Sequence, residues 1–397
     1  MRRITILTAT LCGGVLGAWA QMVPLVGDNL YFNADRVWSY NLYEQSRWGG
    51  GLRWTAAPAW AGGNRLTADT YVGYGYLDRQ WKWGVSIAAS FARSRHSLGA
   101  HASVLQDLIP AGSRSLTATT LADLSTLSSF MNRRMAAALQ LTGGVSWRWK
   151  KMRHLAEVHA HNGKILFSDT RLLYPADGDI CPSYSDYGLR WTGRHDAGLS
   201  AELQGGYNRR PTDRPYLRLL LQYNRSFVIK PFTLSLFGQA GALAPGARGS
   251  YMQAFDLGGT YGAPLFFERS LLTARPGEFT ADRFICLSVM LRVKEPLFVW
   301  MNKVLMLGTA PRPFVRVGGA VGAIDADYYA DVEHLGSLRA PSQGIAEGAA
   351  GIEGLVRWGA VDWGVAAAYR LTPASAPYHL DNAADNLQLL FTATLYM

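Results

Sequence analysis

The sequence has no long hydrophobic run after its N-terminal segment. A helix that crosses a bilayer needs roughly 20 consecutive apolar residues, so this absence excludes a helical membrane protein. The patterns G-x-S-x-G, the phosphate loop and H-E-x-x-H are also absent. These patterns are the common signatures of hydrolases, nucleotide-binding proteins and zinc proteases. We therefore expect a protein that is not an enzyme, with no catalytic residue and no cofactor.

Cysteine is scarce, with three residues in a chain of 397. Cys12 lies in the N-terminal segment that we expect to be removed, which leaves Cys181 and Cys286. An exported location permits a disulfide, but the spacing does not decide whether these two residues meet or stay free.

Charge of one sign is not concentrated in any segment. The chain has 39 Lys and Arg against 29 Asp and Glu, and both kinds are scattered. A nucleic-acid surface gathers its positive charge on one face or in one run. We therefore expect no nucleic-acid partner.

The N-terminus has the features of a secretory signal. Arg2 and Arg3 precede the apolar stretch 4–16, and Ala18 and Ala20 form an A-x-A cleavage site. The expected organisation is a cleaved signal at 1–20, a short N-terminal periplasmic segment at 21–46 and an outer-membrane barrel at 47–397.

Aromatic residues and glycine are abundant, with 13 Trp, 19 Tyr, 15 Phe and 42 Gly. Aromatic-rich strands that alternate apolar and polar residues are typical of transmembrane barrels, in which one set faces lipid and the other faces the lumen. This alternation recurs in segments of about ten residues, long enough to cross a bilayer when tilted. We place strands at 47–58, 68–77, 81–92, 134–149, 152–161, 186–193, 196–208, 215–226, 231–241, 282–294, 312–323, 346–357, 360–371 and 386–396.

These segments predict an all-β, transmembrane antiparallel barrel of about 14 strands. The range is 12–16, because the long connections 162–185 and 242–281 can each hide further strands. Short connections in such barrels lie in the periplasm and long ones outside. The predicted periplasmic turns are 78–80, 150–151, 194–195, 227–230 and 358–359, with the longer connection 295–311 as the exception on that side. The predicted external loops are 59–67, 93–133, 162–185, 209–214, 242–281, 324–345 and 372–385.

The hairpin between residues 67 and 91 has an unusual density of aromatic residues. A two-residue turn at Asp78-Arg79 would place Tyr76 opposite Trp81. Tyr74 would then lie opposite Trp83. Aromatic residues gather at the two interfaces of a bilayer. We therefore predict an aromatic girdle at a periplasmic turn, formed by Tyr74, Tyr76, Trp81 and Trp83.

The last strand, LQLLFTATLYM, alternates apolar and polar residues up to the C-terminus. It is similar to the signal that outer-membrane assembly machinery recognises, although it ends in Met397 rather than the usual Phe. The expected location is therefore the outer membrane of a Gram-negative cell. The expected partners are outer-membrane lipid and, through this strand, the assembly machinery.

Four segments follow one another in the order YNLYEQSRWGGGLRW, YVGYGYLDRQWKWGVSI, EPLFVWMNKVLMLG and AAGIEGLVRWGAVDWGVAAAYRLT. In order and spacing they resemble a Bacteroidota family of outer-membrane β-barrels of unknown function. Longer members of that family carry an N-terminal carboxypeptidase-regulatory-like domain, which we expect to be absent here. The resemblance implies a location and a fold rather than an activity. The terminal strands also resemble, more loosely, the barrels that assemble or translocate proteins.

The segment EVHAHNG is the best candidate for a chemical site. Glu157, His159 and His161 share one strand face, which we expect to line the lumen. Alternate residues of a strand can ligate a metal together, but the further ligands are not identifiable from the sequence, so a metal remains unknown. Ordinary lumen-lining polar residues are the alternative.

Four other segments have an open interpretation. Two acidic clusters in long connections are either solvated loop acids or calcium ligands; they hold Asp177, Asp179 and Asp186, and Asp325, Asp327, Asp331 and Glu333. The segment 119–135 is either a plug or an exposed lid. The apolar segment 295–307 is either a membrane-surface element or a buried turn.

The leading functional hypothesis is a channel or transport-type barrel for small polar solutes. It rests on arginines expected to line the lumen: Arg134, Arg148, Arg218, Arg292 and Arg316. The alternative is a structural, assembly or translocation barrel that acts through surface loops and partner proteins. A separate plug or surface partner is possible, and an outer-membrane enzyme is the third hypothesis.

Overall fold

A computed structural model describes most of the chain. The described residues are 22–26, 29–33, 39–41, 45–56, 64–93, 96–110, 134–167, 183–210, 213–244, 253–257, 271–274, 279–293, 311–324, 340–358, 361–372 and 386–395. None of these ranges contains a helix that is both long and apolar enough to span a membrane.

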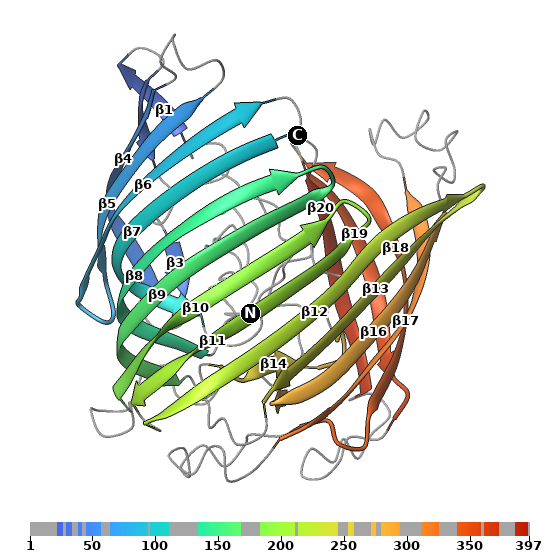
Figure 1. The fold of residues 1–397 in the computed structure, drawn as a ribbon. Coiled ribbons are helices and arrows are strands. Elements are labelled where there is room, and N and C mark those ends of the chain that lie inside the picture. The colour runs from blue at the N-terminus through green and yellow to red at the C-terminus, as the bar shows by residue number, and fades with distance from the viewer. Residues whose placement is uncertain are drawn as a thin grey trace.

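The fold is one antiparallel sheet of 18 strands that curves around a lumen (Figure 1). Its strands are β1 (Met22–Val26), β2 (Leu30–Asn33), β3 (Ser39–Asn41), β4 (Gln45–Ala56), β5 (Arg65–Gly75), β6 (Trp81–Arg93), β7 (His96–Pro110), β8 (Arg134–Trp149), β9 (Met152–Phe167), β10 (Ser183–His195), β11 (Leu199–Arg210), β12 (Arg214–Ile229), β13 (Phe232–Leu243), β16 (Arg283–Val293), β17 (Arg312–Ala323), β18 (Ile345–Trp358), β19 (Val361–Arg370) and β20 (Leu387–Leu395). A separate pair is formed by β14 (Phe255–Leu257) and β15 (Phe279–Ala281).

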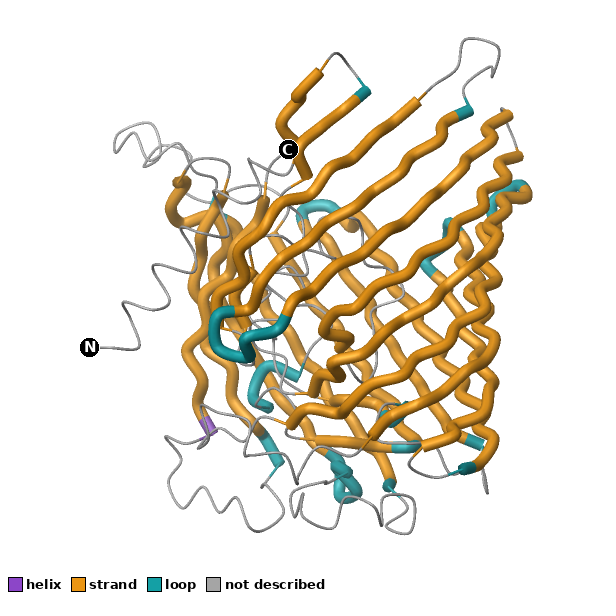
Figure 2. Tube along the Cα trace, turned by 90° about the vertical axis from the view of Figure 1, so that its left-hand side faces the viewer, coloured by secondary structure: helices purple, strands orange, loops and turns teal. Residues whose placement is uncertain are grey.

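The strands form a meander in which each pairs with the next along the chain, with β13 pairing with β16. β2 and β3 both pair with β4 and together make one interrupted strand, while β1 pairs with β2. Leaving β1 aside, the barrel therefore has 16 strands. Figure 2 shows the strands tilted around the lumen. Among the described residues no pairing joins β20 to the N-terminal strands, so the sheet is not closed.

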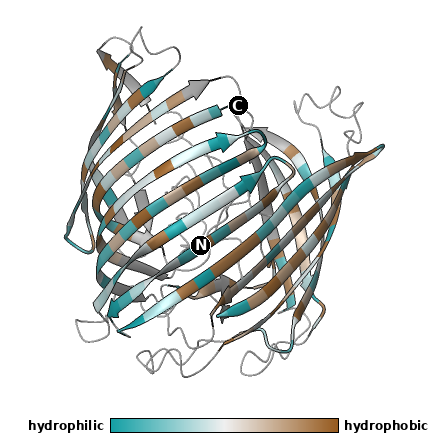
Figure 3. Cartoon of the chain, viewed as in Figure 1, coloured by the Kyte–Doolittle hydropathy of each residue, from teal (hydrophilic) through white to brown (hydrophobic). Residues whose placement is uncertain are grey.

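The two faces of the sheet differ in chemistry, as β16 illustrates. Ile285, Leu287 and Val289 are exposed on the outer face. Phe284 and Met290 alternate with them and are buried in the lumen. The same alternation is visible along other strands in Figure 3. An outer face of exposed aliphatic side chains suits lipid rather than water. The predicted fold class, an all-β transmembrane antiparallel barrel, is thus confirmed, with a strand number at the upper end of the predicted range.

Two strands were missed by the sequence analysis. β7 lies within 93–133, which was predicted to be one external loop; it pairs with β6 over 96–106 and with β8 along its whole length. Its alternation is weak because it consists largely of small and polar residues, HSLGAHASVLQDLIP. The interrupted β2–β3 strand lies within 21–46, which was predicted to precede the barrel.

Because β7 was not predicted, the connections that precede it lie at the opposite end of the barrel from the one predicted. Antiparallel strands alternate in direction, so every second connection lies at the same end of a barrel. Counting from the β5–β6 turn at 76–80, the connections 111–133, 168–182 and 244–282 lie at the same end. The turn at 76–80 therefore lies at the end with the long loops, and not with the short turns where the sequence analysis placed it. The connection between β4 and β5, predicted to be external, likewise lies at the short-turn end.

The register of the β5–β6 hairpin also differs from the prediction. Tyr74 pairs with Trp81 and Val72 with Trp83, a shift of two residues that leaves both faces unchanged. The turn is longer than two residues: the Gly75 amide donates to the Gln80 carbonyl at 3.0 Å. Asp78 shapes this turn by accepting hydrogen bonds from the Gln80 amide at 3.2 Å and from Lys82 Nζ.

The corrected topology can be tested by labelling cysteines in intact cells. We expect Gln80→Cys to react with a membrane-impermeant maleimide from outside, because its turn shares an end with the long loops. Lys151→Cys lies at the opposite end and should react only after the outer membrane is permeabilised. Both positions are exposed. Both variants are made in a Cys181→Ser background to remove a loop thiol. Equal protection of the two positions would contradict this topology.

Candidate functional site

The lumen contains part of the chain's own connection between β13 and β16. We call residues 253–257, 271–274 and 279–281 the inserted segment; it includes β14 and β15. Side chains of this segment such as Phe255, Leu272 and Thr280 are almost completely withdrawn from solvent. In Figure 1, β14 lies behind the wall formed by β12 and β13.

Apolar contacts hold the inserted segment against the wall. Two buried clusters join it to inward side chains: Tyr184, Leu220, Phe237, Leu243, Phe284, Cys286, Ala320 and Ile345 in the first, and Met290, Phe314, Ala349, Ala366 and Ala368 in the second. The Phe255 ring packs on Phe284 with centroids 5.0 Å apart. Gly241 makes room for it, because a Cβ at that position would lie 2.7 Å from Phe255 Cζ. This part of the lumen is therefore a packed core.

Glu347 on β18 is the main polar anchor of the inserted segment. Its carboxylate accepts hydrogen bonds from the Leu272 amide at 2.8 Å, the Thr273 amide at 2.9 Å and Thr273 Oγ1 at 2.8 Å. It also pairs with Arg316 Nη1 at 2.5 Å, and both side chains are fully buried. A buried carboxylate needs such compensation, since an unpaired one is strongly destabilising.

Two further wall residues bind the same turn. Arg370 Nη2 donates to the Thr273 carbonyl at 2.7 Å, and Gln388 Nε2 donates to the same carbonyl at 2.9 Å. Together with Glu347 these side chains bind both the amide and the carbonyl of Thr273. Strands β18, β19 and β20 thus meet at a single residue of the inserted segment.

The other end of the inserted segment meets β10 and β12. Gln253 Nε2 donates to Asp186 Oδ2 and to the Tyr184 hydroxyl, each at 3.3 Å. The Arg218 guanidinium lies over the Phe255 ring, 4.4 Å from its centroid, and Nη1 donates to Glu202 at 2.6 Å. A cation over an aromatic face is stabilised further when both are shielded from water.

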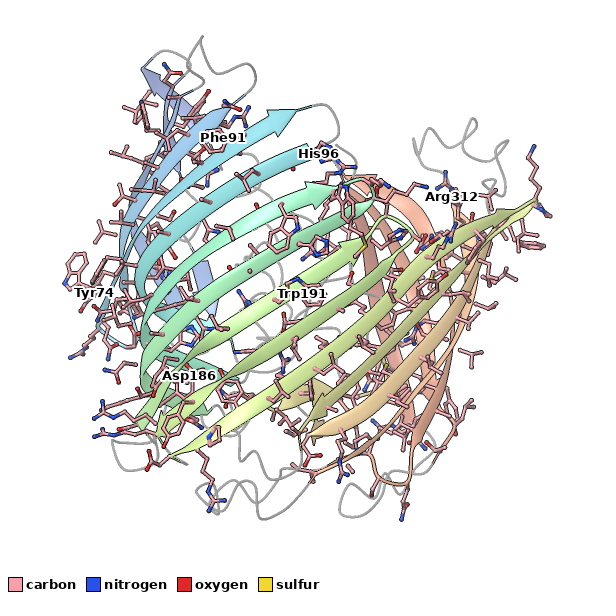
Figure 4. The ribbon with its side chains drawn as sticks, viewed as in Figure 1. Tyr74, Phe91, His96, Asp186, Trp191 and Arg312 are labelled. Atoms are coloured by element: carbon pink, nitrogen blue, oxygen red, sulfur yellow. The ribbon has the colours of Figure 1, made fainter. Side chains whose placement is uncertain are left out.

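A polar cluster surrounds Asp186, whose place on β10 is labelled in Figure 4. His161 Nδ1 lies 2.7 Å from Asp186 Oδ1, and His159 Nε2 lies 3.4 Å from Oδ2. The Tyr216 hydroxyl donates to Asp186 Oδ2 at 2.9 Å and accepts from Gln204 Nε2 at 3.1 Å. The Asp186 side chain is fully buried.

The predicted lumen-lining residues have the following places. Glu157 is buried and pairs with Arg190 and, through Oε1, with His101 Nε2 at 3.0 Å. Three of the predicted arginines pair with a carboxylate of the wall: Arg218 with Glu202, Arg292 with Glu353 at 2.7 Å and Arg316 with Glu347. Arg148 is part-exposed at the end of β8, 3.6 Å from Asp196. The side chain of Arg134 lies outside the described residues.

The predicted girdle residues lie on the outer surface of β5 and β6 or in their turn. Tyr76 and Trp81 are 68% and 60% exposed, and Trp83 Nε1 donates to Gln106 at 2.8 Å. The rings of Tyr74 and Trp81 pack with centroids 5.1 Å apart. By the topology above, this aromatic group is at the long-loop end of the barrel rather than at the short-turn end.

Several other predictions need correction or fall outside the structure. Asp186 was interpreted as a loop acid, but it is buried on β10 because the strand begins at Ser183. The segment described in the lumen comes from 242–281. Residues 119–133, for which a plug or a lid was predicted, lie outside the described residues. Cys286 is buried and free. The segment 295–307 and Cys181 also lie outside the described residues. The same holds for the other acids of the two predicted clusters: Asp177, Asp179, Asp325, Asp327, Asp331 and Glu333.

Fold and site together define an antiparallel barrel whose lumen holds a segment of its own chain. No family model and no curated protein matches the sequence. Among solved structures, CdiB from Acinetobacter baumannii aligns with a TM-score of 0.46 and 10% identity, over 88% of this chain and 57% of that chain. BamA from Haemophilus ducreyi lacking POTRA domains 1–3 aligns at 0.47 and 11%, over 97% and 78%. The outer membrane protein OprD from Pseudomonas aeruginosa aligns at 0.27 and 12%, over 93% and 92%.

This chain thus spans little more than half the length of the CdiB chain. Similarities with TM-scores below 0.5 and about one identical residue in ten do not assign an activity. The function has to be argued from the lumen itself.

The anchor can be tested by Glu347→Gln, which removes the charge and keeps the shape. We expect a loss of about 3–5 kcal/mol in the free energy of unfolding, because Arg316 loses its buried carboxylate partner. Urea unfolding in detergent, followed by tryptophan fluorescence, measures it. Glu353→Gln is the matched control: its pair with Arg292 is less buried, so a smaller loss is expected. Equal losses in the two variants would argue against a special role for Glu347.

Proposed function

We propose that this protein is an outer-membrane barrel of the transport type, closed in this state by its inserted segment. The observation that carries the proposal is the bonding of the Leu272–Thr273 turn to β18, β19 and β20 inside the lumen. A segment that occupies part of a lumen narrows the path for free diffusion. Passage then requires the segment to move away from these strands.

The polar side chains of the opposite wall support the proposal that the transported solutes are small and polar. The contacts of the inserted segment described above are with β10, β12, β13 and β16–β20. Strands β4–β9 instead place buried or half-buried polar side chains inward, including Arg47, Lys82, Asp107 and Glu157. Arg47 Nη1 donates to Asp107 at 3.0 Å, so this wall is polar without a large excess of one charge. Such a surface favours hydrated solutes over apolar ones.

Planar-bilayer recordings test the closed state. We expect the intact barrel to be closed for most of the time, and a variant with residues 253–281 replaced by a short Gly-Ser linker to conduct ions steadily. Glu347→Gln should raise the open probability by about tenfold for each 1.4 kcal/mol by which the closed state is weakened.

Glu353→Gln serves as the control for the recordings, because its carboxylate binds Arg292 on the wall. It should leave the open probability close to that of the intact protein. Heat-dependent electrophoretic mobility verifies that each barrel is folded. No conductance from the folded linker variant would rule out the transport proposal.

A second candidate, assembly or translocation of other proteins, is favoured by a different observation. The sheet is not closed, and the described residues of β20 pair with β19 on one side. A strand edge inside a bilayer leaves backbone groups in need of hydrogen bonds. Another polypeptide can supply them by adding a strand. A β-strand of a client protein, added at this edge of β20, would supply the missing backbone hydrogen bonds. We call this edge the seam.

A photo-crosslinking amino acid at Leu389 tests the seam. Leu389 lies on β20 and is 79% exposed. If the second candidate holds, crosslinking in cells should give adducts with other membrane β-proteins. The same probe at Leu221, an exposed residue of the fully paired strand β12, should give few of them. Equal adducts at the two positions would count against a client site at the seam.

A further inference from the structure

Three metal-ligating side chains converge in the lumen wall near the inserted segment. His159 and His161 alternate along β9, so both point inward. Asp186 on β10 pairs in register directly with His161, which places its carboxylate on the same face. One ligand atom from each residue lies within 4.8 Å of the other two.

The geometry points to a binding site for Zn²⁺ formed by His159, His161 and Asp186. We propose that His159 Nε2, a ring nitrogen of His161 and a carboxylate oxygen of Asp186 are the protein ligands. Zinc bonds of about 2.0–2.1 Å in a tetrahedral arrangement separate neighbouring ligand atoms by about 3.3 Å. The separation of His159 Nε2 and Asp186 Oδ2 is 3.4 Å.

The donor set selects among metals. Imidazole nitrogens suit zinc and other transition metals, whereas Ca²⁺ and Mg²⁺ prefer sites made wholly of oxygen. Two imidazoles and one carboxylate leave a fourth tetrahedral position, as in zinc sites that keep an open coordination place. The Tyr216 hydroxyl lies 3.1 Å from His159 Nε2.

The surroundings hold the carboxylate ligand in place. Gln204 Nε2 lies 3.3 Å from His159 Nε2, so zinc on that nitrogen would replace this contact. The Tyr216 hydroxyl and Gln253 Nε2 both donate to Asp186 Oδ2. Hydrogen bonds of this kind orient ligands and raise the affinity of a site. The two imidazole rings are stacked with centroids 5.1 Å apart.

Glu157, which shares a strand face with the two histidines, is not part of the site. Its Oε2 accepts from Arg190 Nε at 2.7 Å, and its Oε1 faces His101. These contacts engage both carboxylate oxygens away from His161. The carboxylate that completes the site therefore comes from the neighbouring strand.

Zinc at this position would affect a contact that holds the inserted segment in the lumen. Asp186 is the acceptor for Gln253, a residue of the inserted segment. A metal that takes over the carboxylate would change how the segment is held at β10. The site thus couples a metal to one of the segment's polar contacts, whether or not the barrel transports a solute.

Direct metal binding tests the proposal and needs no functional assay. The full-length barrel, purified in detergent without a histidine tag and stripped with EDTA, is dialysed against Zn²⁺ and its zinc content measured by mass spectrometry. We expect about one zinc per chain. Co²⁺ in its place should give visible absorption bands, which added Zn²⁺ abolishes.

Near-isosteric variants assign the ligands. His161→Gln and Asp186→Asn should each weaken Zn²⁺ binding by at least about 100-fold, the upper end of the loss seen when only an outer-shell partner is removed. His101→Gln is the matched control, because this half-buried lumen histidine contacts Glu157 instead. His159→Gln is a third ligand variant, in case one of the others does not fold.

Heat-dependent mobility verifies folding before each measurement. The proposal is overturned if the folded intact protein binds no stoichiometric zinc. It is overturned equally if the folded ligand variants bind zinc as tightly as the intact protein, or if His101→Gln loses binding to the same extent. Loss of zinc in the ligand variants alone supports it.

Discussion

The structure depends on one constraint: backbone amides and carbonyls that lie in a bilayer must be hydrogen-bonded within the protein. The hairpin of β8 and β9 shows the solution, with an unbroken register from Trp149 opposite Met152 to Arg134 opposite Phe167. Once strands pair in this way, side chains can only alternate between lipid and lumen. The aliphatic outer face and the mixed inner face follow from the same constraint. The seam beside β20 is the place where the described pairing stops.

The same requirement governs the inserted segment, because its backbone is also removed from water. The amides of Leu272 and Thr273 have no strand neighbour and bond instead to Glu347. The carbonyl of Thr273 is bound by Arg370 and Gln388. A buried carboxylate with an arginine partner thereby replaces the sheet as the source of hydrogen bonds. Since removing one member leaves the others unsatisfied, the wall and the segment behave as a cooperative unit.

A second contact between wall and segment has different charged neighbours. Asp186 accepts from Tyr216 and Gln253 and lies beside two imidazoles. Unlike Glu347, it has no arginine among these neighbours. The proposed zinc site would change the partners of Asp186, whereas Glu347 is paired with Arg316. The segment thus has one polar contact with an arginine-paired carboxylate and another with a carboxylate beside two imidazoles.

The sequence by itself determined the barrel class, the faces of its strands and many of their limits; β8 and β17 have the predicted bounds, 134–149 and 312–323. Alternation is a local property repeated at every second residue, so it can be read without knowing the neighbours. β7 was not predicted, because its small residues give little contrast between the two faces of the strand. Without this strand, the 76–80 turn was assigned to the wrong end of the barrel. His159 and His161 were identified, but their carboxylate neighbour was not, because only strand pairing brings Asp186 opposite His161. Glu347 meets Thr273 across 74 residues, and no local pattern encodes that contact. Only the tertiary structure decided which inward side chains meet, because that depends on how the strands and the inserted segment are arranged around the lumen.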